Sequence, residues 1–125
     1  MAKILSIDDD PGLQDLVAEV LGREGHEVHW AFNGEEGYEK AQTFHPDLII
    51  LDMMLPTLNG MEVLRLLKAH KDLRDIPVVV VTAFSGEAAF KESAVRDLGA
   101  REYLQKPVPI DVLTTTVASL LGPTR

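Results

Sequence analysis

The sequence contains no cysteine, which excludes disulfide bonds, cysteine-ligated zinc and thiol redox chemistry. It also lacks any apolar run near the ~20 residues that a membrane-spanning helix needs, because Asp, Pro or Lys interrupts each one. The first five residues, Met1 to Leu5, lead directly into a strand-like segment and lack the apolar region and cleavage site of a signal peptide. These absences lead us to expect a cytoplasmic protein with no membrane segment.

Positive charge is scarce, since 12 Lys and Arg residues face 20 Asp and Glu residues and give a net charge of −8. A surface of this sign repels phosphate backbones, so direct binding of nucleic acid is not expected. Apolar residues are plentiful, at 46% of 125 residues, which is enough for a complete hydrophobic core. The length suits one domain over residues 1–125, with its core between about residues 3 and 121.

Short apolar runs alternate with longer amphipathic segments from one end of the chain to the other. This alternation predicts a parallel sheet with helices on both faces, because parallel strands need crossover connections. The predicted strands are Lys3–Ile7, Glu27–Phe32 (with Val28, Trp30 and Phe32 on one face), Asp47–Asp52, Pro77–Thr82 and Arg101–Gln105. The predicted helices carry, in order, Leu13, Leu16, Val17, Val20 and Leu21; Tyr38, Ala41 and Phe44; Leu64 and Leu67; Phe90, Ala94, Val95 and Leu98; and the segment Pro109–Leu121.

Polar side chains stand where four of the five predicted strands end. Asp8 and Asp9 follow the first strand, Asp52 ends the third, Thr82 ends the fourth and Lys106 follows the fifth. Function in such sheets gathers at the carboxyl ends of the strands. We therefore expect these side chains to lie together at one edge.

Three carboxylates at one edge repel one another, and one of them would take up a proton unless a cation neutralised the group. Lys106 supplies one positive charge, and Mg²⁺, which prefers oxygen ligands, most simply supplies the rest. A carboxylate can also attack phosphorus and form an aspartyl phosphate. Mg²⁺, Lys106 and the Thr82 hydroxyl would then stabilise the transferred oxygens.

The motifs at these strand ends resemble those of the response-regulator receiver domain. They are Ile7-Asp8-Asp9, the segment Asp52 to Gly60, Val81-Thr82-Ala83 and the segment Tyr103 to Pro107, and the resemblance extends from about Lys3 to Leu121. It implies an α/β, flavodoxin-like (βα)5 three-layer sandwich with a five-stranded parallel sheet of order 2-1-3-4-5.

The resemblance also implies a role for each site residue. Asp52 would be the phosphoacceptor, and Asp9, Asp52 and the backbone carbonyl of Met54 would bind Mg²⁺. Asp8 would contribute to the metal site directly or through water. Thr82 and Lys106 would contact the phosphoryl oxygens.

A conformational switch is part of the same resemblance. Tyr103 would move between exposed and buried positions as Thr82 moves toward the phosphoryl group, although a fixed, half-buried core ring is the alternative for Tyr103. The Lys106–Pro107 peptide bond is expected to be cis, as in the family. Phe84, two residues after Thr82, stands where receivers vary.

The function implied is that of a phosphoacceptor in a two-component or phosphorelay system, a signalling protein that assists its own phosphorylation and dephosphorylation and is not an enzyme. The phosphodonor would be a sensor histidine kinase or a histidine phosphotransfer protein, because none of His26, His29, His45 and His70 is placed for that role. Phosphorylation would remodel the surface of helix four, strand five and helix five. That surface would control a downstream protein or an output domain missing from this sequence.

Asp10 is the acidic residue that we do not assign to the metal. Pro11 follows it, and this pair is typical of a helix N-cap and first helical position.

Three other functions are alternatives to the receiver interpretation. A phosphatase of the haloacid-dehalogenase type needs a second carboxylate two residues after its nucleophile, where this chain has Met54. A dinucleotide-binding unit needs a glycine-rich turn, which Asp8 to Gly12 does not provide. A receiver fold that binds partners without phosphorylation stays open as the main alternative.

Overall fold

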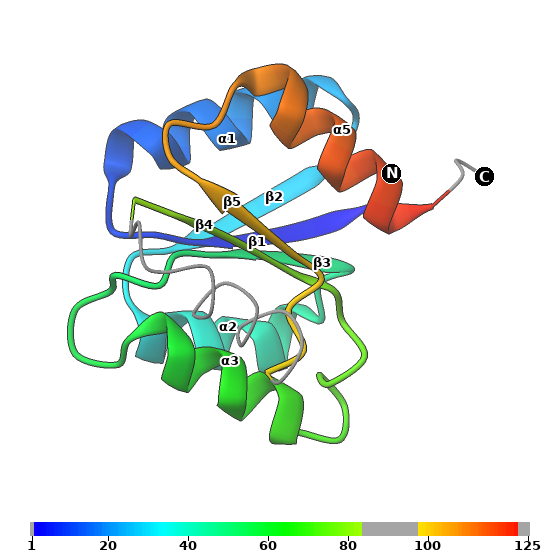
Figure 1. Ribbon diagram of the computed structural model, residues 1–125. Coiled ribbons are helices and arrows are strands. Elements are labelled where there is room, and N and C mark those ends of the chain that lie inside the picture. The colour runs from blue at the N-terminus through cyan, green and yellow to red at the C-terminus, as the bar shows by residue number, and fades with distance from the viewer. Residues whose placement is uncertain (1, 84–97, 123–125) are drawn as a thin grey trace.

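A five-stranded parallel sheet runs through the middle of the protein, with helices on both of its faces (Figure 1). The computed structural model describes residues 2–83 and 98–122. The strands are β1 (Lys3–Ile7), β2 (Glu27–Ala31), β3 (Leu48–Leu51), β4 (Val78–Thr82) and β5 (Glu102–Gln105). All neighbouring strands are parallel and their order is β2-β1-β3-β4-β5, which confirms the predicted fold class and strand order.

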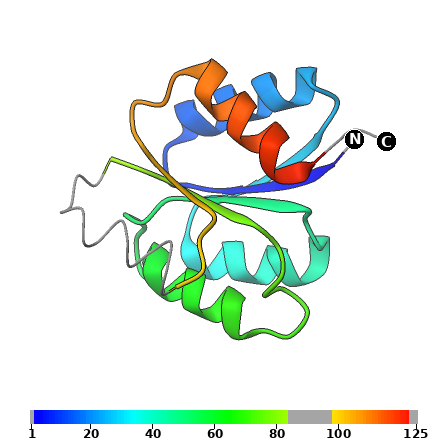
Figure 2. The ribbon, with the colours of Figure 1, turned by 45° about the vertical axis from the view of Figure 1, so that its right-hand side comes forward.

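Among the described residues, α-helices lie on both faces of the sheet, as Figures 1 and 2 show from two directions. On one face lie α1 (Pro11–Arg23) and α5 (Ile110–Leu121), and on the other lie α2 (Gly34–Phe44) and α3 (Gly60–Ala69). The predicted fourth helix with Phe90, Ala94 and Val95, and the variable residue Phe84, fall outside the described residues. Within the described ranges, no helix combines the length and the apolar character that crossing a membrane requires.

Side-chain caps fix the starts of three helices. Asp10 Oδ1 accepts hydrogen bonds from the N–H groups of Gly12 and Leu13 at 3.0 and 3.3 Å, which confirms its predicted role at the start of α1. Asn33 and Asn59 accept in the same way at the starts of α2 and α3. Helix α5 begins at Ile110, one residue later than predicted, and Pro109 is its cap residue.

The core has two parts, one on each face of the sheet. Alternate residues of β1 divide between them, since Leu5 and Ile7 pack toward α2 and α3 while Ile4 packs toward α1 and α5. Every residue of β3 is buried, as predicted for a strand covered on both faces. Burial of each such aliphatic side chain contributes about 1.5–3 kcal/mol to the stability of the fold. The two layers of the core therefore hold the strands, and the residues at their carboxyl ends, in place.

Strands β3, β4 and β5 begin one residue later than predicted, β3 also ends one residue earlier, at Leu51, and the exposure of some side chains on α1 and β2 differs from the sequence prediction. On α1, the buried residues are Gln14, Val17 and Leu21, whereas Leu16 is 39% exposed. On β2, which ends at Ala31 rather than Phe32, Trp30 and Phe32 stay well exposed. β2 is an edge strand, so the helices cover it incompletely and its aromatic side chains remain at the rim.

Candidate functional site

The carboxyl ends of β1 and β3 place two aspartates side by side. The Asp8 N–H donates to the Ala31 carbonyl and the Asp52 N–H donates to the Ile7 carbonyl, both at 3.0 Å. The sheet hydrogen bonding therefore continues one residue past each of these strands. These backbone hydrogen bonds therefore place the side chains of Asp8 and Asp52 at the same edge of the sheet.

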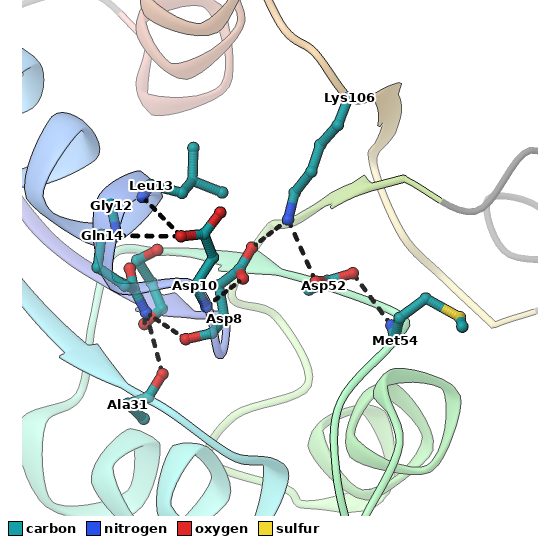
Figure 3. A network of polar contacts seen from close by, with 10 residues as sticks. Asp8, Asp10, Gly12, Leu13, Gln14, Ala31, Asp52, Met54 and Lys106 are labelled. Atoms are coloured by element: carbon teal, nitrogen blue, oxygen red, sulfur yellow. Dashed lines mark hydrogen bonds and ion pairs between the residues drawn. The ribbon is translucent and has the colours of Figure 1, made fainter.

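Lys106, which follows β5, reaches across to both aspartates (Figure 3). Its Nζ lies 2.7 Å from Asp8 Oδ2 and 3.3 Å from Asp52 Oδ2. Asp8 and Asp52 are only 3% and 4% exposed, whereas Asp9 is exposed at the rim. Carboxylate oxygens of Asp8, Asp9 and Asp52 all lie within 4.8 Å of one another, so the predicted acidic cluster is present.

Each buried carboxylate divides its two oxygens between a backbone donor and the lysine. Asp8 Oδ1 accepts from the Asp10 N–H and Asp52 Oδ1 accepts from the Met54 N–H, both at 3.0 Å. The second oxygen of each faces Lys106. Met54 thus touches Asp52 through its backbone, while its side chain is 58% exposed; a metal-binding role for the Met54 carbonyl stays a prediction.

The electrostatics of the cluster favour an added cation. Burial raises the pKa of Asp8 and the charge of Asp52 raises it further, although the hydrogen bonds from Lys106 and the Asp10 N–H oppose both effects. Burial alone would lower the pKa of Lys106, but its hydrogen bond to Asp8 and the charges of Asp8 and Asp52 outweigh burial and raise that pKa. Lys106 therefore stays positive, and one positive charge serves three carboxylates.

Thr82 and Tyr103 lie in the two strands next to this cluster. Thr82 ends β4 and is fully buried, and Tyr103 is 8% exposed in β5. Burial raises the pKa of Tyr103, with the negative charge of Asp52 as the second cause. Tyr103 therefore occupies the buried position here, and its predicted movement with Thr82 stays a prediction.

One further expectation from the sequence is met by the structure, since the Lys106–Pro107 peptide bond is cis. Among the described residues, the one group of at least three acidic or histidine side chains close enough together to hold a metal is that of Asp8, Asp9 and Asp52. That these residues bind a metal stays a prediction.

Glycine at position 60 lets helix α3 start directly against the acidic edge, by which we mean the carboxyl-terminal edge of the sheet with Asp8, Asp9 and Asp52. The Gly60 N–H donates to the Met53 carbonyl at 3.1 Å. A Cβ at this position would collide with the carbonyl oxygen of Asp52 and would lie 2.5 Å from the Met53 Cα. The start of α3 therefore packs directly against the peptide bond between Asp52 and Met53.

Gln14 is a residue of this region that the sequence prediction missed. Its buried side-chain nitrogen contacts the carbonyl oxygens of Asp8 and Ala31 (Figure 3). It also contacts the carbonyl oxygen of Ser6. A signal was present in the sequence, because Gln14 precedes Val17 and Leu21 by three and seven residues and so shares their buried helix face.

Comparison with known proteins decides the family. A family model described as the response regulator receiver domain matches residues 4–118. The chain belongs to this family. Members of this family interact with histidine kinases and with downstream targets in two-component systems, and they are signalling proteins that are generally not classed as enzymes.

Curated relatives of the receiver domain include proteins of two lengths. RpaA of Synechocystis, described as a DNA-binding dual master transcriptional regulator, is 40% identical over 121 residues, which are 97% of this chain and 49% of RpaA. This chain therefore spans about half the length of that relative. The polar-differentiation response regulator DivK of Brucella ovis is 33% identical over 119 residues, which are 95% of each chain.

Solved structures give the same family likeness. The chemotaxis response regulator CheY4 of Vibrio cholerae superimposes with a TM-score of 0.87 at 28% identity, covering 96% of this chain and 98% of that one. The receiver domain of a putative LuxO repressor protein from Vibrio parahaemolyticus superimposes with a TM-score of 0.88, also at 28% identity, covering 96% of this chain and 89% of that one.

Proposed function

We propose that this receiver domain, one domain over residues 1–125, accepts a phosphoryl group on Asp52 from a partner phosphohistidine and thereby controls a partner protein. The observation that carries the proposal is the ion pair of Lys106 with Asp8 and Asp52, two buried carboxylates beside the exposed Asp9. A purely structural cluster gains little from an excess of buried negative charge.

The donor set of the acidic edge suits Mg²⁺. Its candidate ligands are carboxylate oxygens of Asp8, Asp9 and Asp52, together with the Met54 carbonyl, and Mg²⁺ is a hard ion that prefers such oxygens. Burial is the main cause of the raised pKa of Asp8, and a bound cation would favour its ionised form. When bound, Mg²⁺ would neutralise negative charge on the phosphoryl oxygens.

Asp52 would act as the nucleophile. One of its carboxylate oxygens forms a bond to phosphorus while the bond from phosphorus to the donor imidazole nitrogen breaks, and the electron pair leaves with the imidazole. The Met54 N–H, 3.0 Å from Asp52 Oδ1, orients the carboxylate for this attack. Lys106 already contacts Asp52 Oδ2 and would hold the phosphoryl oxygens in the same way.

The output would arise from the neighbouring strands. The Thr82 hydroxyl would donate a hydrogen bond to the new phosphoryl group, and Tyr103 would move in response. Tyr103 sits in β5, so its movement would change the surface that β5 and α5 share with the predicted fourth helix. A sensor histidine kinase or histidine phosphotransfer protein would supply the phosphoryl group, and a downstream protein or output domain would read the surface.

The test is the intact mass of the protein after incubation with acetyl phosphate, with and without Mg²⁺, for wild type and for Asp52→Asn. We expect one added phosphoryl group in wild type with Mg²⁺ and none in Asp52→Asn. Uptake by Asp52→Asn at the wild-type rate would refute the assignment of the acceptor. No uptake by either protein, from acetyl phosphate or from a phosphorylated histidine protein, would favour the alternative of binding without phosphorylation.

A further inference from the structure

Gln14 is a buried polar residue that the proposed chemistry does not use. It lies on the sheet side of α1, is 2% exposed, and shares that buried face with Val17 and Leu21. Its side-chain nitrogen lies 3.0 Å from the Ser6 carbonyl, 2.9 Å from the Asp8 carbonyl and 3.0 Å from the Ala31 carbonyl. One amide group therefore joins the carboxyl ends of β1 and β2.

These contacts restrain the backbone of Asp8 on both sides of its Cα. The Asp8 N–H donates to the Ala31 carbonyl at 3.0 Å, and Gln14 Nε2 donates to that carbonyl and to the Asp8 carbonyl. The N–H belongs to the peptide before Asp8 and the carbonyl to the peptide after it. Fixing both peptides fixes the direction in which the Asp8 side chain leaves the backbone.

The same contact reaches Asp9. The Asp8 carbonyl is part of the peptide that joins Asp8 to Asp9, so the hydrogen bond from Gln14 also orients the start of Asp9. Asp9 is the exposed member of the acidic cluster, and Asp8 is the buried one. Gln14 thus contacts the peptide that joins two of the three clustered aspartates, and it approaches Asp8 from the side away from Lys106 (Figure 3).

An apolar residue would serve packing alone better than Gln14 does. The Oε1 atom of Gln14 is buried and has no hydrogen-bond partner among the residues that the structure describes, which is a cost to stability. Val17 and Leu21 fill the neighbouring positions of the same face with no such cost. Residues that break a local packing rule are expected at functional sites.

We propose that Gln14 is a positioning residue for the metal site, which holds Asp8 and Asp9 in place through the backbone carbonyls at the ends of β1 and β2. The metal part of this inference rests on the proposed function. The backbone part does not, because it concerns contacts that exist without metal. The two parts can therefore be tested separately.

The first experiment measures amide hydrogen exchange in metal-free wild type, Gln14→Met and Val17→Ala. Methionine matches the length of glutamine but donates no hydrogen bond, and Val17→Ala weakens the same helix face without touching the strand-end carbonyls. The reference is the Ile49 N–H, which donates to the Pro77 carbonyl at 3.0 Å in the core of the sheet. Relative to Ile49, we expect the Asp8 N–H to exchange about tenfold faster in Gln14→Met only. Equal ratios in the two variants would overturn the proposal.

The second experiment measures the dissociation constant of Mg²⁺ for the three folded proteins. We expect about tenfold weaker binding in Gln14→Met and near wild-type binding in Val17→Ala, with phosphoryl uptake by Gln14→Met restored at saturating Mg²⁺. Unchanged Mg²⁺ affinity in Gln14→Met would overturn the metal part. If wild type itself bound no Mg²⁺, the proposed function would fail, and hydrogen exchange alone would decide whether Gln14 positions Asp8.

The wild-type protein also provides a test that needs no variant, should Gln14→Met not fold. The side-chain amide protons of Gln14 should exchange slowly with solvent, and their NMR signals should shift when Mg²⁺ is added. Fast exchange of these protons would overturn the proposal. So would Gln14 side-chain signals that stay unchanged on addition of Mg²⁺ while the signals of Asp8 shift.

Discussion

Replacing Gly60 by alanine tests how closely α3 must approach the acidic edge. A Cβ at position 60 would lie 2.5 Å from the Met53 Cα and 2.9 Å from the Asp52 carbonyl carbon, and still closer to the Asp52 oxygen. Ordinary contacts begin near 3.4 Å, so the helix and the peptide must separate by at least about 0.9 Å at the Met53 Cα and by more at the Asp52 oxygen. Both sides of this contact are backbone, which cannot yield by changing a rotamer.

The cost can be estimated from two opposing effects. Overpacking of this kind costs about 1–3 kcal/mol, and the better helix propensity of alanine returns at most about 1 kcal/mol. We therefore expect Gly60→Ala to lose up to about 3 kcal/mol of unfolding free energy, with roughly 1–2 kcal/mol in the middle of the range. The displaced peptide bond directly follows Asp52, so its movement also moves the Asp52 side chain. Phosphoryl uptake should therefore fall about 10- to 100-fold, the penalty typical of a reacting group moved by about 1 Å.

The assay combines urea denaturation with the rate of phosphoryl uptake, read as intact mass well below the unfolding transition. Gly22→Ala is the matched control, because a Cβ there meets no atom within 4 Å, and it should gain up to about 1 kcal/mol. Ile4→Val, at the other end of β1, should lose about 0.5–1.5 kcal/mol by truncation of a fully buried side chain. Both should take up phosphoryl groups at the wild-type rate. Wild-type uptake by Gly60→Ala, or equal loss of uptake by Ile4→Val, would refute the reasoning.

Three further predictions follow from the site and its loops. In Asp8→Asn, the metal-free protein should be more stable than wild type by about 1 kcal/mol at neutral pH. Because the pKa of Asp8 is raised in the fold, this gain should fade as the pH falls through the folded pKa toward 3.8, and a gain independent of pH would contradict the account. Thr57 has φ of 62°, so Thr57→Gly should raise the unfolding free energy by about 1 kcal/mol in urea denaturation, and a loss would contradict this. Thr82→Ala should still be phosphorylated but lose the shift of the Tyr103 ring signals in NMR spectra; an unchanged shift would refute the coupling of Thr82 to Tyr103.

The sequence predicted that the acidic residues and Lys106 lie together, because the topology determines where strand ends meet. Asp8, Asp52 and Lys106 each follow a run of strand residues, and a parallel sheet brings the carboxyl ends of its strands to one edge. Errors of one residue in the predicted ends of the strands did not matter for this prediction. The acidic cluster was thus predictable before any contact was known.

The parts that were missed depend on which side of an element the fold covers. Leu16 fits the helical spacing of α1 as well as Gln14 does, and hydrophobicity alone favours Leu16 for the core. Gln14 is buried instead, with its side-chain nitrogen against the strand-end carbonyls of Ser6 and Ala31, and those carbonyls are identified only once β1 and β2 are paired. The exposure of Trp30 likewise follows from the position of β2 at the sheet edge, which periodicity does not report.

Direct localisation of the acyl phosphate tests the central claim most closely. Wild type would be phosphorylated with acetyl phosphate and Mg²⁺, reduced with borohydride so that a phosphorylated aspartate becomes homoserine, and digested for peptide mass spectrometry. The account predicts homoserine at position 52 and unmodified aspartate at positions 8 and 9. Homoserine at position 8 or 9, with Asp52 intact, would contradict it.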